Sequence, residues 1–272
     1  MKKTILVLAL IVAFAASSFA SVSFLTATGV GEGKCALLGL YAATHNGDLG
    51  GQPDVGGAMD ATSIGVRIEY GLMKDVDILA AYSMDNLINI NDFGDPYTLA
   101  VKQIAGSTTD LGIKYTFAKD GDKIWGMTAL MDMAVAGGIE TSTATIKAEG
   151  EGSIDIGGSS MSLGAIFSKK MGMFIPYGAI AYKSLTANNG RDPQTGVWLD
   201  PVSGVGLALN IGMYIGVAAN QAIAIEYNTE NQSYGDLTSH GKTKILGGAA
   251  SLKDTGYSKS VSAISLGYVY MF

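Results

Sequence analysis

The sequence predicts an all-β protein: a closed antiparallel up-and-down β-barrel of about ten strands, with twelve or eight strands as the alternatives. Along most of the chain, large apolar residues recur at every second position, which is the period of a strand. The segments between these stretches alternate between long and short. Charged residues make up only 15% of the chain, which is rich in Tyr, Thr, Ser and Gly, and this composition favours strands over helices.

Residues 1–20 have the pattern of a cleaved secretory signal peptide. Two lysines precede an apolar run over residues 5–16, and Ser18 and Ala20 occupy the small-residue positions before a cleavage site. The run is shorter than the roughly 20 residues that a transmembrane anchor needs. We therefore expect residues 21–272 to form the mature barrel domain, and removal of the two lysines changes the formal net charge from −6 to −8.

Composition also restricts the partners. An acidic chain without a basic stripe argues against nucleic acid as a partner. Cys35 is the only cysteine, so an internal disulfide cannot form, and the residue is most simply a small side chain on a strand.

The strands are predicted in order from the alternation and from the turn residues between them. For the seventh strand, the sequence does not indicate which face points inward, because both faces are apolar and Pro176 interrupts one of them. The predicted strands lie within residues 33–44, 61–70, 76–84, 107–118, 124–137, 159–168, 174–185, 205–213, 223–228 and 259–272.

Long connections are predicted at about 87–107, 139–157, 186–201 and 231–258, and short turns at 71–75, 119–122, 169–172 and 216–220. A further hairpin around Lys244 to Leu252 would raise the count to twelve.

The last strand carries a resemblance to a known class of proteins. It ends on Phe272 with large apolar residues at every second position before it, and it resembles the closing strand of bacterial outer-membrane β-barrel proteins. The string EYGLMKDVDI, residues 69–78, resembles a periplasmic turn of the same proteins. The resemblance implies a transmembrane barrel in the cell outer membrane, with long extracellular loops and short periplasmic turns. It further implies that Tyr268, Tyr270 and Phe272 form an assembly signal.

The same resemblance implies outer-membrane lipid as the permanent partner, and the barrel-assembly machinery and periplasmic chaperones as partners during biogenesis. A closed barrel agrees with this environment, because every backbone N–H and C=O inside hydrocarbon needs an internal partner. Several aromatic residues fall beside the proposed short turns, where an interfacial girdle would lie. These membrane-interface candidates are Tyr70, Phe117, Trp125, Phe174 and Tyr214.

Polar and charged residues recur on the strand faces opposite the apolar ones. They would either line a path for ions or small solutes, or pair with one another and fill a narrow interior. These lumen-lining candidates are Arg67, Glu69, Asp77, Asp110, Lys114, Asp132, Asn210 and Glu226.

No motif of an enzyme or a metal site is present. The chain has only two histidines, His45 and His240, both assigned to predicted extracellular loops, and it lacks H-E-x-x-H and G-x-S-x-G. We expect no catalytic residue, no cofactor and no metal.

Two other folds compete with the barrel. Residues 201–225 are free of charge and long enough for an inner-membrane helix, and a soluble β-sandwich would also alternate. For the barrel, the sequence predicts a small porin-like channel, or else a closed structural or surface-binding barrel without transport; an outer-membrane enzyme is a minor alternative.

Overall fold

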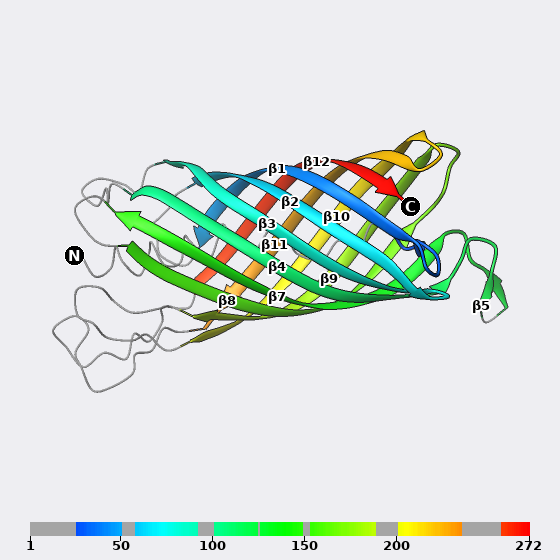
Figure 1. Ribbon diagram of the computed structural model, residues 1–272. Coiled ribbons are helices and arrows are strands. Elements are labelled where there is room, and N and C mark those ends of the chain that lie inside the picture. Colours follow the sequence, from blue (N-terminus) through cyan, green and yellow to red (C-terminus); the bar gives the residue numbers. More distant parts are fainter. Residues whose placement is uncertain are drawn as a thin grey trace.

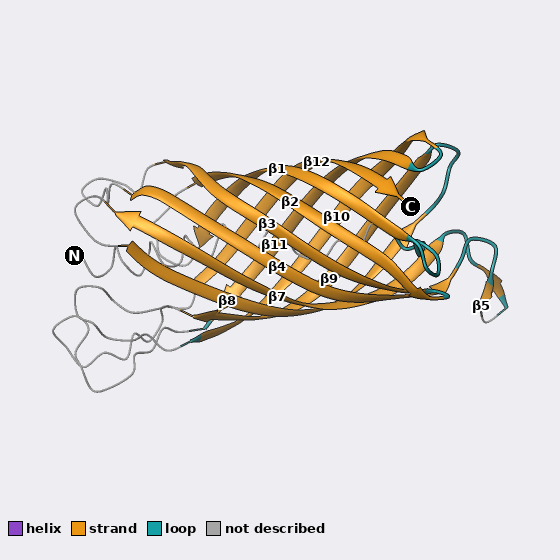
Figure 2. Cartoon of the chain, in the orientation of Figure 1, coloured by secondary structure: helices purple, strands orange, loops and turns teal. Residues whose placement is uncertain are grey.

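Ten antiparallel strands close into one barrel in the computed structural model of the chain (Figures 1 and 2). The structure describes residues 26–50, 58–91, 101–124, 126–148, 153–188, 201–235 and 257–272. Each barrel strand pairs with the strands before and after it in the chain, and the last pairs with the first, so the topology is up-and-down. The predicted fold class and the count of ten strands are confirmed. The signal peptide and the hairpin around Lys244 to Leu252 lie outside the described residues.

The strands run for 14 to 18 residues, longer than the stretches that the alternation predicts. The barrel consists of β1 (Cys35–Gly50), β2 (Ala58–Met73), β3 (Val76–Asn91), β4 (Val101–Ala118), β7 (Asp132–Ala148), β8 (Ser153–Ser168), β9 (Phe174–Asn188), β10 (Val202–Ala218), β11 (Gln221–Tyr234) and β12 (Tyr257–Met271).

The barrel closes where the first and last strands meet. β1 and β12 pair from Ala36 opposite Met271 to Gly50 opposite Ser258, with one irregularity between Gly47 and Leu49. At the chain end, the Cys35 N–H donates to the Phe272 carbonyl and the Phe272 N–H donates to the Cys35 carbonyl, each at 2.9 Å. This ladder removes the two free edges that an open ten-stranded sheet would expose.

The two ends of the barrel differ, and we name them by their connections. The turn rim carries residues 74–75, 119–131, 169–173 and 219–220. The loop rim is the opposite end, where β1 is joined to β2, β3 to β4, β7 to β8, β9 to β10 and β11 to β12. Phe272 lies at the turn rim, at the same end as the start of β1 (Figure 1).

The outer face of the wall is apolar over the half next to the turn rim. Exposed side chains alternate there with buried ones, as in β12, where Ile264, Leu266 and Tyr268 are exposed and Ser265 and Val269 are buried. Toward the loop rim the outward residues become polar; examples are Thr141, Ser159, Ser184, Ser203 and Ser233. The apolar part of the outer wall, which we call the apolar belt, includes Ile68, Ile78, Ile113, Val135, Leu163, Ile180, Leu209, Ile211, Ile225, Ile264 and Leu266.

The connection from β4 to β7 differs from the sequence prediction. A tight turn at 119–122 and a strand from Ile124 were predicted, but the barrel strand begins only at Asp132. The intervening residues form a separate two-stranded hairpin, β5 (Lys123–Ile124) and β6 (Met127–Thr128), which extends beyond the turn rim in Figure 1. Positive φ angles at Gly121 and Gly126 allow the chain to reverse here. Met127 therefore lies in this hairpin and Met131 in the connection that leads to β7, and neither belongs to the wall.

The connection predicted at 139–157 is also mostly strand, because β7 continues to Ala148 and β8 begins at Ser153. Thr, Ser and Gly in this stretch suggest a loop in sequence, yet they pair residue by residue from Ile139 opposite Met161 to Lys147 opposite Ser153. Long strands that stand beyond a bilayer can carry polar residues on both faces.

The stretch 201–225, considered as an inner-membrane helix, forms β10 and the start of β11. Within the described part of the chain, no helix is long and apolar enough to cross a membrane. The sandwich alternative is also wrong, because the ten strands form one closed sheet and not two stacked ones.

Candidate functional site

The interior of the barrel is filled with polar and charged side chains, and this filling is the candidate functional site. All eight predicted lumen candidates are buried, with at most 7% of any residue exposed. Whether any of them lies along a route for solutes stays a prediction. The contacts fall into three groups, which follow one another from the turn rim toward the loop rim.

The first group is centred on Lys114 of β4. Its ammonium group donates to the Glu69 carboxylate on β2 and lies 3.0 Å from Asp77 Oδ2 on β3. It also donates to the backbone carbonyls of Thr26 at 2.8 Å and Thr28 at 3.2 Å. Lys114 is therefore surrounded by four oxygens, two from the wall and two from the chain that precedes β1.

That preceding chain, residues 26–32, enters the turn end of the barrel, and we call it the N-terminal plug. Thr26 and Ala27 are buried there, whereas Thr28 and Glu32 are exposed. Thr116 donates to the Ala27 carbonyl at 2.7 Å, and the Ala27 N–H donates to Ser168 Oγ at 3.1 Å. The Thr28 hydroxyl donates to the Asp132 carboxylate, whose other oxygen accepts from the Asp120 N–H at 2.8 Å. The plug thus contacts three strands, β4, β7 and β8, far from it in sequence.

Gly71 of β2 positions the backbone at Gly33 and Lys34, where the chain leaves the plug and enters β1. The Gly33 N–H donates to the Gly71 carbonyl at 2.9 Å, and the Gly71 N–H donates to the Lys34 carbonyl at 3.0 Å. A side chain at position 71 would collide with the Gly31 carbonyl. Only glycine permits this approach of the two backbones.

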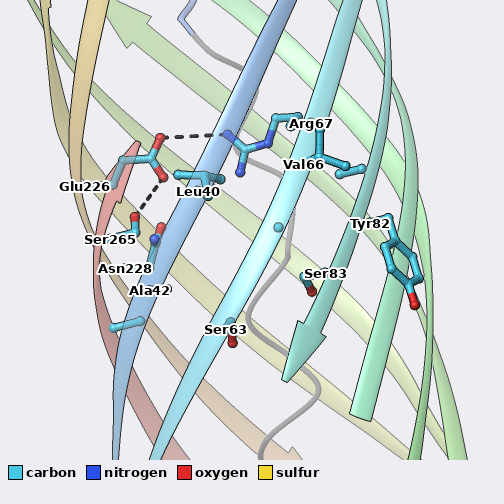
Figure 3. Close-up of a pocket in the computed structure, with 13 residues that line it drawn as sticks. Leu40, Ala42, Ser63, Val66, Arg67, Tyr82, Ser83, Glu226, Asn228 and Ser265 are labelled. Atoms are coloured by element: carbon cyan, nitrogen blue, oxygen red, sulfur yellow. Dashed lines mark hydrogen bonds and ion pairs between the residues drawn. The ribbon is translucent and has the colours of Figure 1, made fainter. Parts of the chain in front are cut away.

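The second group surrounds Glu226 of β11. The hydroxyls of Tyr177 and Tyr214 both donate to Glu226 Oε1, the latter at 3.3 Å, and Ser265 Oγ donates to Oε2 at 3.4 Å. Arg67 Nη1 lies 3.8 Å from Glu226 Oε1, as Figure 3 shows. The two tyrosine rings stack with centroids 5.2 Å apart, so carboxylate, guanidinium and rings together fill this part of the interior.

The third group is centred on Lys183 of β9, nearer the loop rim. Its ammonium group lies 3.0 Å from Glu230 Oε2 and 3.6 Å from Glu140 Oε2. Gln232 Nε2 donates to Glu230 Oε1 at 2.7 Å, and the Tyr234 hydroxyl donates to Gln232 Oε1 at 3.0 Å. Strands β7, β9 and β11 are thereby linked across the interior.

A small cavity lies between the second group and the wall formed by β1, β2, β3, β11 and β12. Its volume is about 40 Å³, and its polar lining comprises Arg67, Ser63, Ser83, Asn228 and Ser265 with Glu226 (Figure 3). Such a volume holds a few water molecules, since one water needs roughly 10–15 Å³.

Sequence reasoning missed part of the site. Glu140 was placed in a connection, Lys183 lay on the strand of unassigned faces, and Glu230 followed the predicted end of its strand. The alternation itself could have found Asp85 and Glu230, because each continues the inward parity of Asp77 and Glu226. The missed buried polar residues are Asp85, Glu140, Lys183, Glu230 and Gln232.

Tyr214 corrects the predicted aromatic girdle. It is 3% exposed and points inward, because it shares the parity of Asn210 on β10. Tyr70, Phe117 and Phe174 are exposed on the outer side near the turn rim, at 40%, 45% and 43%. Trp125 lies outside the described residues.

The residues predicted as an assembly signal share one face of β12. Tyr268, Tyr270 and Phe272 are all exposed outward, and the rings of Tyr270 and Phe272 are 5.5 Å apart. Recognition by assembly machinery stays a prediction.

The described residues contain no group of three or more His, Cys, Asp or Glu side chains that could hold a metal ion. His45 was predicted in a loop but lies on β1, opposite Asp60 and Ser262 in the backbone register, because β1 continues beyond the predicted strand. His240 lies outside the described residues. The absence of catalysis stays an expectation.

No protein-family model matches the sequence, and no curated protein matches it. Solved structures of similar architecture include the transport unit of the autotransporter AIDA-I from Escherichia coli, at 10% identity, TM-score 0.49 and 97% coverage of both chains. The translocator domain of the autotransporter NalP from Neisseria meningitidis matches at 12% identity and TM-score 0.48, over 88% of each chain. The outer membrane protease OmpT from Escherichia coli matches at 15% identity and TM-score 0.44, over 93% of this chain and 99% of its own.

The architecture defines the class of the protein. Ten strands close on themselves, apolar side chains cover the outside, and polar ones fill the inside, which is the arrangement of outer-membrane β-barrel proteins. The predicted resemblance to that class is confirmed, and no specific family within it is identified.

Proposed function

We propose that the protein is an outer-membrane β-barrel whose interior is closed to solutes, and that it serves as a membrane anchor for the segments that join its strands at the loop rim. The apolar belt supports the membrane location, because so many exposed apolar side chains on one closed wall need hydrocarbon around them. An export signal at residues 1–20 and assembly through the C-terminal strand are parts of the same proposal.

The observation that carries the closed interior is the N-terminal plug held over Lys114. Plug and wall share hydrogen bonds at Lys114, Thr116, Asp132 and Ser168, so the turn end of the lumen is occupied by protein. Beyond the plug, the Glu226 group links β9 to β11, and the Lys183 group links β7, β9 and β11 inside the barrel. A solute would have to displace paired buried charges, and such disruption is costly in a low-dielectric interior.

Planar-bilayer recording tests this proposal. Folded protein, identified by heat-modifiable migration on gels, should give no discrete current steps at neutral pH. Regular steps of uniform size from the same folded preparation would contradict the closed interior and leave the membrane location intact.

A cation channel is the second candidate, favoured by the sign of the interior charge. Among the described residues, eight buried carboxylates face three buried basic side chains, Arg67, Lys114 and Lys183. If current steps are recorded, replacement of Asp132 or Glu226 by Lys should reduce or reverse a preference for cations. Unchanged selectivity in both variants would remove the interior carboxylates from the ion path.

A further inference from the structure

Three exposed lysines and three exposed apolar side chains gather on the turn rim, and we call this set the rim patch. Its members come from three successive connections at that end of the barrel. They are Lys74, Lys123 and Lys170 together with Met127, Leu130 and Met171.

The three connections that carry the rim patch are held to one another by ion pairs. Lys119 lies 2.6 Å from Asp75, which joins the β4–β7 connection to the β2–β3 turn. Lys169 lies 3.5 Å from Asp120 and donates to the Leu130 carbonyl at 2.6 Å, which joins the same connection to the β8–β9 turn.

The hairpin that carries much of the patch is itself closed by backbone hydrogen bonds. The Gly121 N–H donates to the Ala129 carbonyl at 2.9 Å, and the Ala129 N–H donates to the Asp122 carbonyl at 2.7 Å. Lys123 and Met127 are therefore presented in a defined position at the rim.

The uncompensated charge of the patch is positive in an acidic protein. Asp75 and Asp120 are each paired with a lysine of the same connections. Asp122 accepts only from the backbone N–H of Lys119, at 2.7 Å, so its negative charge offsets one of the three patch lysines and the balance stays positive. The structure shows no ion pair between the three patch lysines and any described acidic residue. The whole chain, by contrast, has a formal net charge of −6.

The apolar members of the patch are strongly exposed: Met127 and Leu130 at 70% each, and Met171 at 59%. They adjoin the apolar belt, which reaches the same rim through Leu72, Met73 and Phe174. The patch therefore lies at the end of the apolar belt that is next to the turn rim.

We propose that the rim patch binds anionic phospholipid headgroups of the leaflet on the turn-rim side; this inference rests on the proposed membrane location. The three lysines contact headgroup phosphates, while Met127, Leu130 and Met171 enter the boundary between headgroups and acyl chains. Lysine near a membrane surface attracts anionic lipid, and exposed apolar side chains beside it add buried area. The β5–β6 hairpin, which projects beyond the turn rim in Figure 1, would then be a second contact with the bilayer besides the apolar belt.

Fluorescence quenching by brominated lipids provides the test. The chain has two tryptophans, and Trp198→Phe leaves Trp125, which follows Ile124 of β5 in the sequence, as the single reporter. The Trp198→Phe variant is reconstituted into two kinds of vesicle that contain phosphatidylcholine and phosphatidylglycerol. In one the phosphatidylcholine is brominated and in the other the phosphatidylglycerol, with the brominated lipid at the same mole fraction in both. Brominated phosphatidylglycerol should quench more strongly, with a local enrichment of about fivefold, which one lysine–headgroup contact supports.

Two variants separate the contributions. Lys74→Gln, Lys123→Gln and Lys170→Gln together should equalise quenching by the two lipids. Met127→Gln with Leu130→Gln should weaken quenching by both lipids and keep their ratio. Heat-modifiable migration is checked for each sample. A parent that does not form the barrel would count against the membrane proposal, whereas a folded parent quenched equally by both lipids would count only against lipid selectivity.

Three outcomes would overturn the rim-patch proposal in a folded, inserted protein. Equal quenching by both lipids in the parent would show no preference for anionic headgroups. No quenching by either lipid would place the hairpin away from the bilayer, as a protein partner would require. Selectivity that survives the triple lysine replacement would assign the binding to other residues.

Discussion

Lys114 connects the wall of the barrel to the N-terminal plug through one buried ammonium group. It compensates Glu69 and Asp77, and it is a donor to Thr26 and Thr28 in the plug. A buried charge without a partner of opposite sign destabilises the fold, so Lys114, Glu69 and Asp77 each require the others to stay charged in the interior. A single residue therefore affects both the stability of the wall and the closure of the lumen.

Replacement of Lys114 by Met should lower the free energy of unfolding by about 3–5 kcal/mol, because two buried carboxylates lose their cation. Denaturant unfolding in detergent or vesicles measures this change. The triple variant Lys114→Met, Glu69→Gln, Asp77→Asn should recover much of the loss. A single variant as stable as the parent would contradict the dependence of these groups on one another.

At Gly212 on β10, the ring of Tyr177 occupies the space that a side chain would need. A side chain there would collide with the ring of Tyr177, whereas a side chain at Gly39 on β1 would meet nothing within 4 Å. Gly212→Ala should destabilise the barrel by about 1–3 kcal/mol, and Gly39→Ala should stay within about 0.5 kcal/mol of the parent. Equal unfolding midpoints for the two variants would show that Tyr177 moves aside without cost.

At the scale of elements, the pairing of β1 with β12 decides whether the sheet becomes a barrel. The pair contributes backbone hydrogen bonds up to the last residue, where Cys35 and Phe272 exchange two of them. The plug precedes β1 directly, so ring closure and plug insertion both involve the same segment of chain.

Deletion of Phe272 should reduce the yield of inserted barrel in cells more than it reduces the stability of protein that does insert. It removes an exposed aromatic end and two hydrogen bonds of the closing ladder. The heat-modifiable fraction in outer membranes measures the effect, and Phe272→Tyr, which retains both features, should insert normally. Normal insertion of the truncated chain would count against an assembly role for this residue.

At the scale of the whole molecule, the outer wall defines where the bilayer lies. The belt begins at the turn rim, and the polar wall toward the loop rim stands beyond it, since strands of 14 to 18 residues exceed the roughly 9–11 needed to cross. The barrel is therefore expected to sit off-centre in the membrane, with its loop rim raised above the surface.

Two arginine substitutions on one face of β10 test this placement. Ile211→Arg, in the belt, should cost about 2–4 kcal/mol, the range for a charge near the bilayer midplane of a barrel. Ser203→Arg, outward on the same strand but nearer the loop rim, should be close to neutral. Unfolding in vesicles measures both, and equal costs would place the bilayer elsewhere on the wall.

The alternation of side chains, together with the alternation of long and short connections, predicted the closed barrel and its ten strands. Arg67, Glu69 and Lys114 are buried as expected of the polar face, because a strand has only two faces and the other one is apolar; a role in lining a path for solutes stays a prediction. The same parity applied strictly would have placed Tyr214 inside, next to Asn210. Proximity to a turn was the weaker indication, and it failed there.

By itself, the sequence determined that the chain alternates with a period of two, that its polar faces belong inside, and that it ends as a closing strand, because these properties are local. Only the tertiary structure decided which buried charges meet. The contacts of Lys114 with the plug and of Lys183 with Glu140 and Glu230 depend on register and curvature around the ring, which no single strand encodes. For the same reason the filling of the lumen, on which the proposed closed interior rests, required the folded barrel.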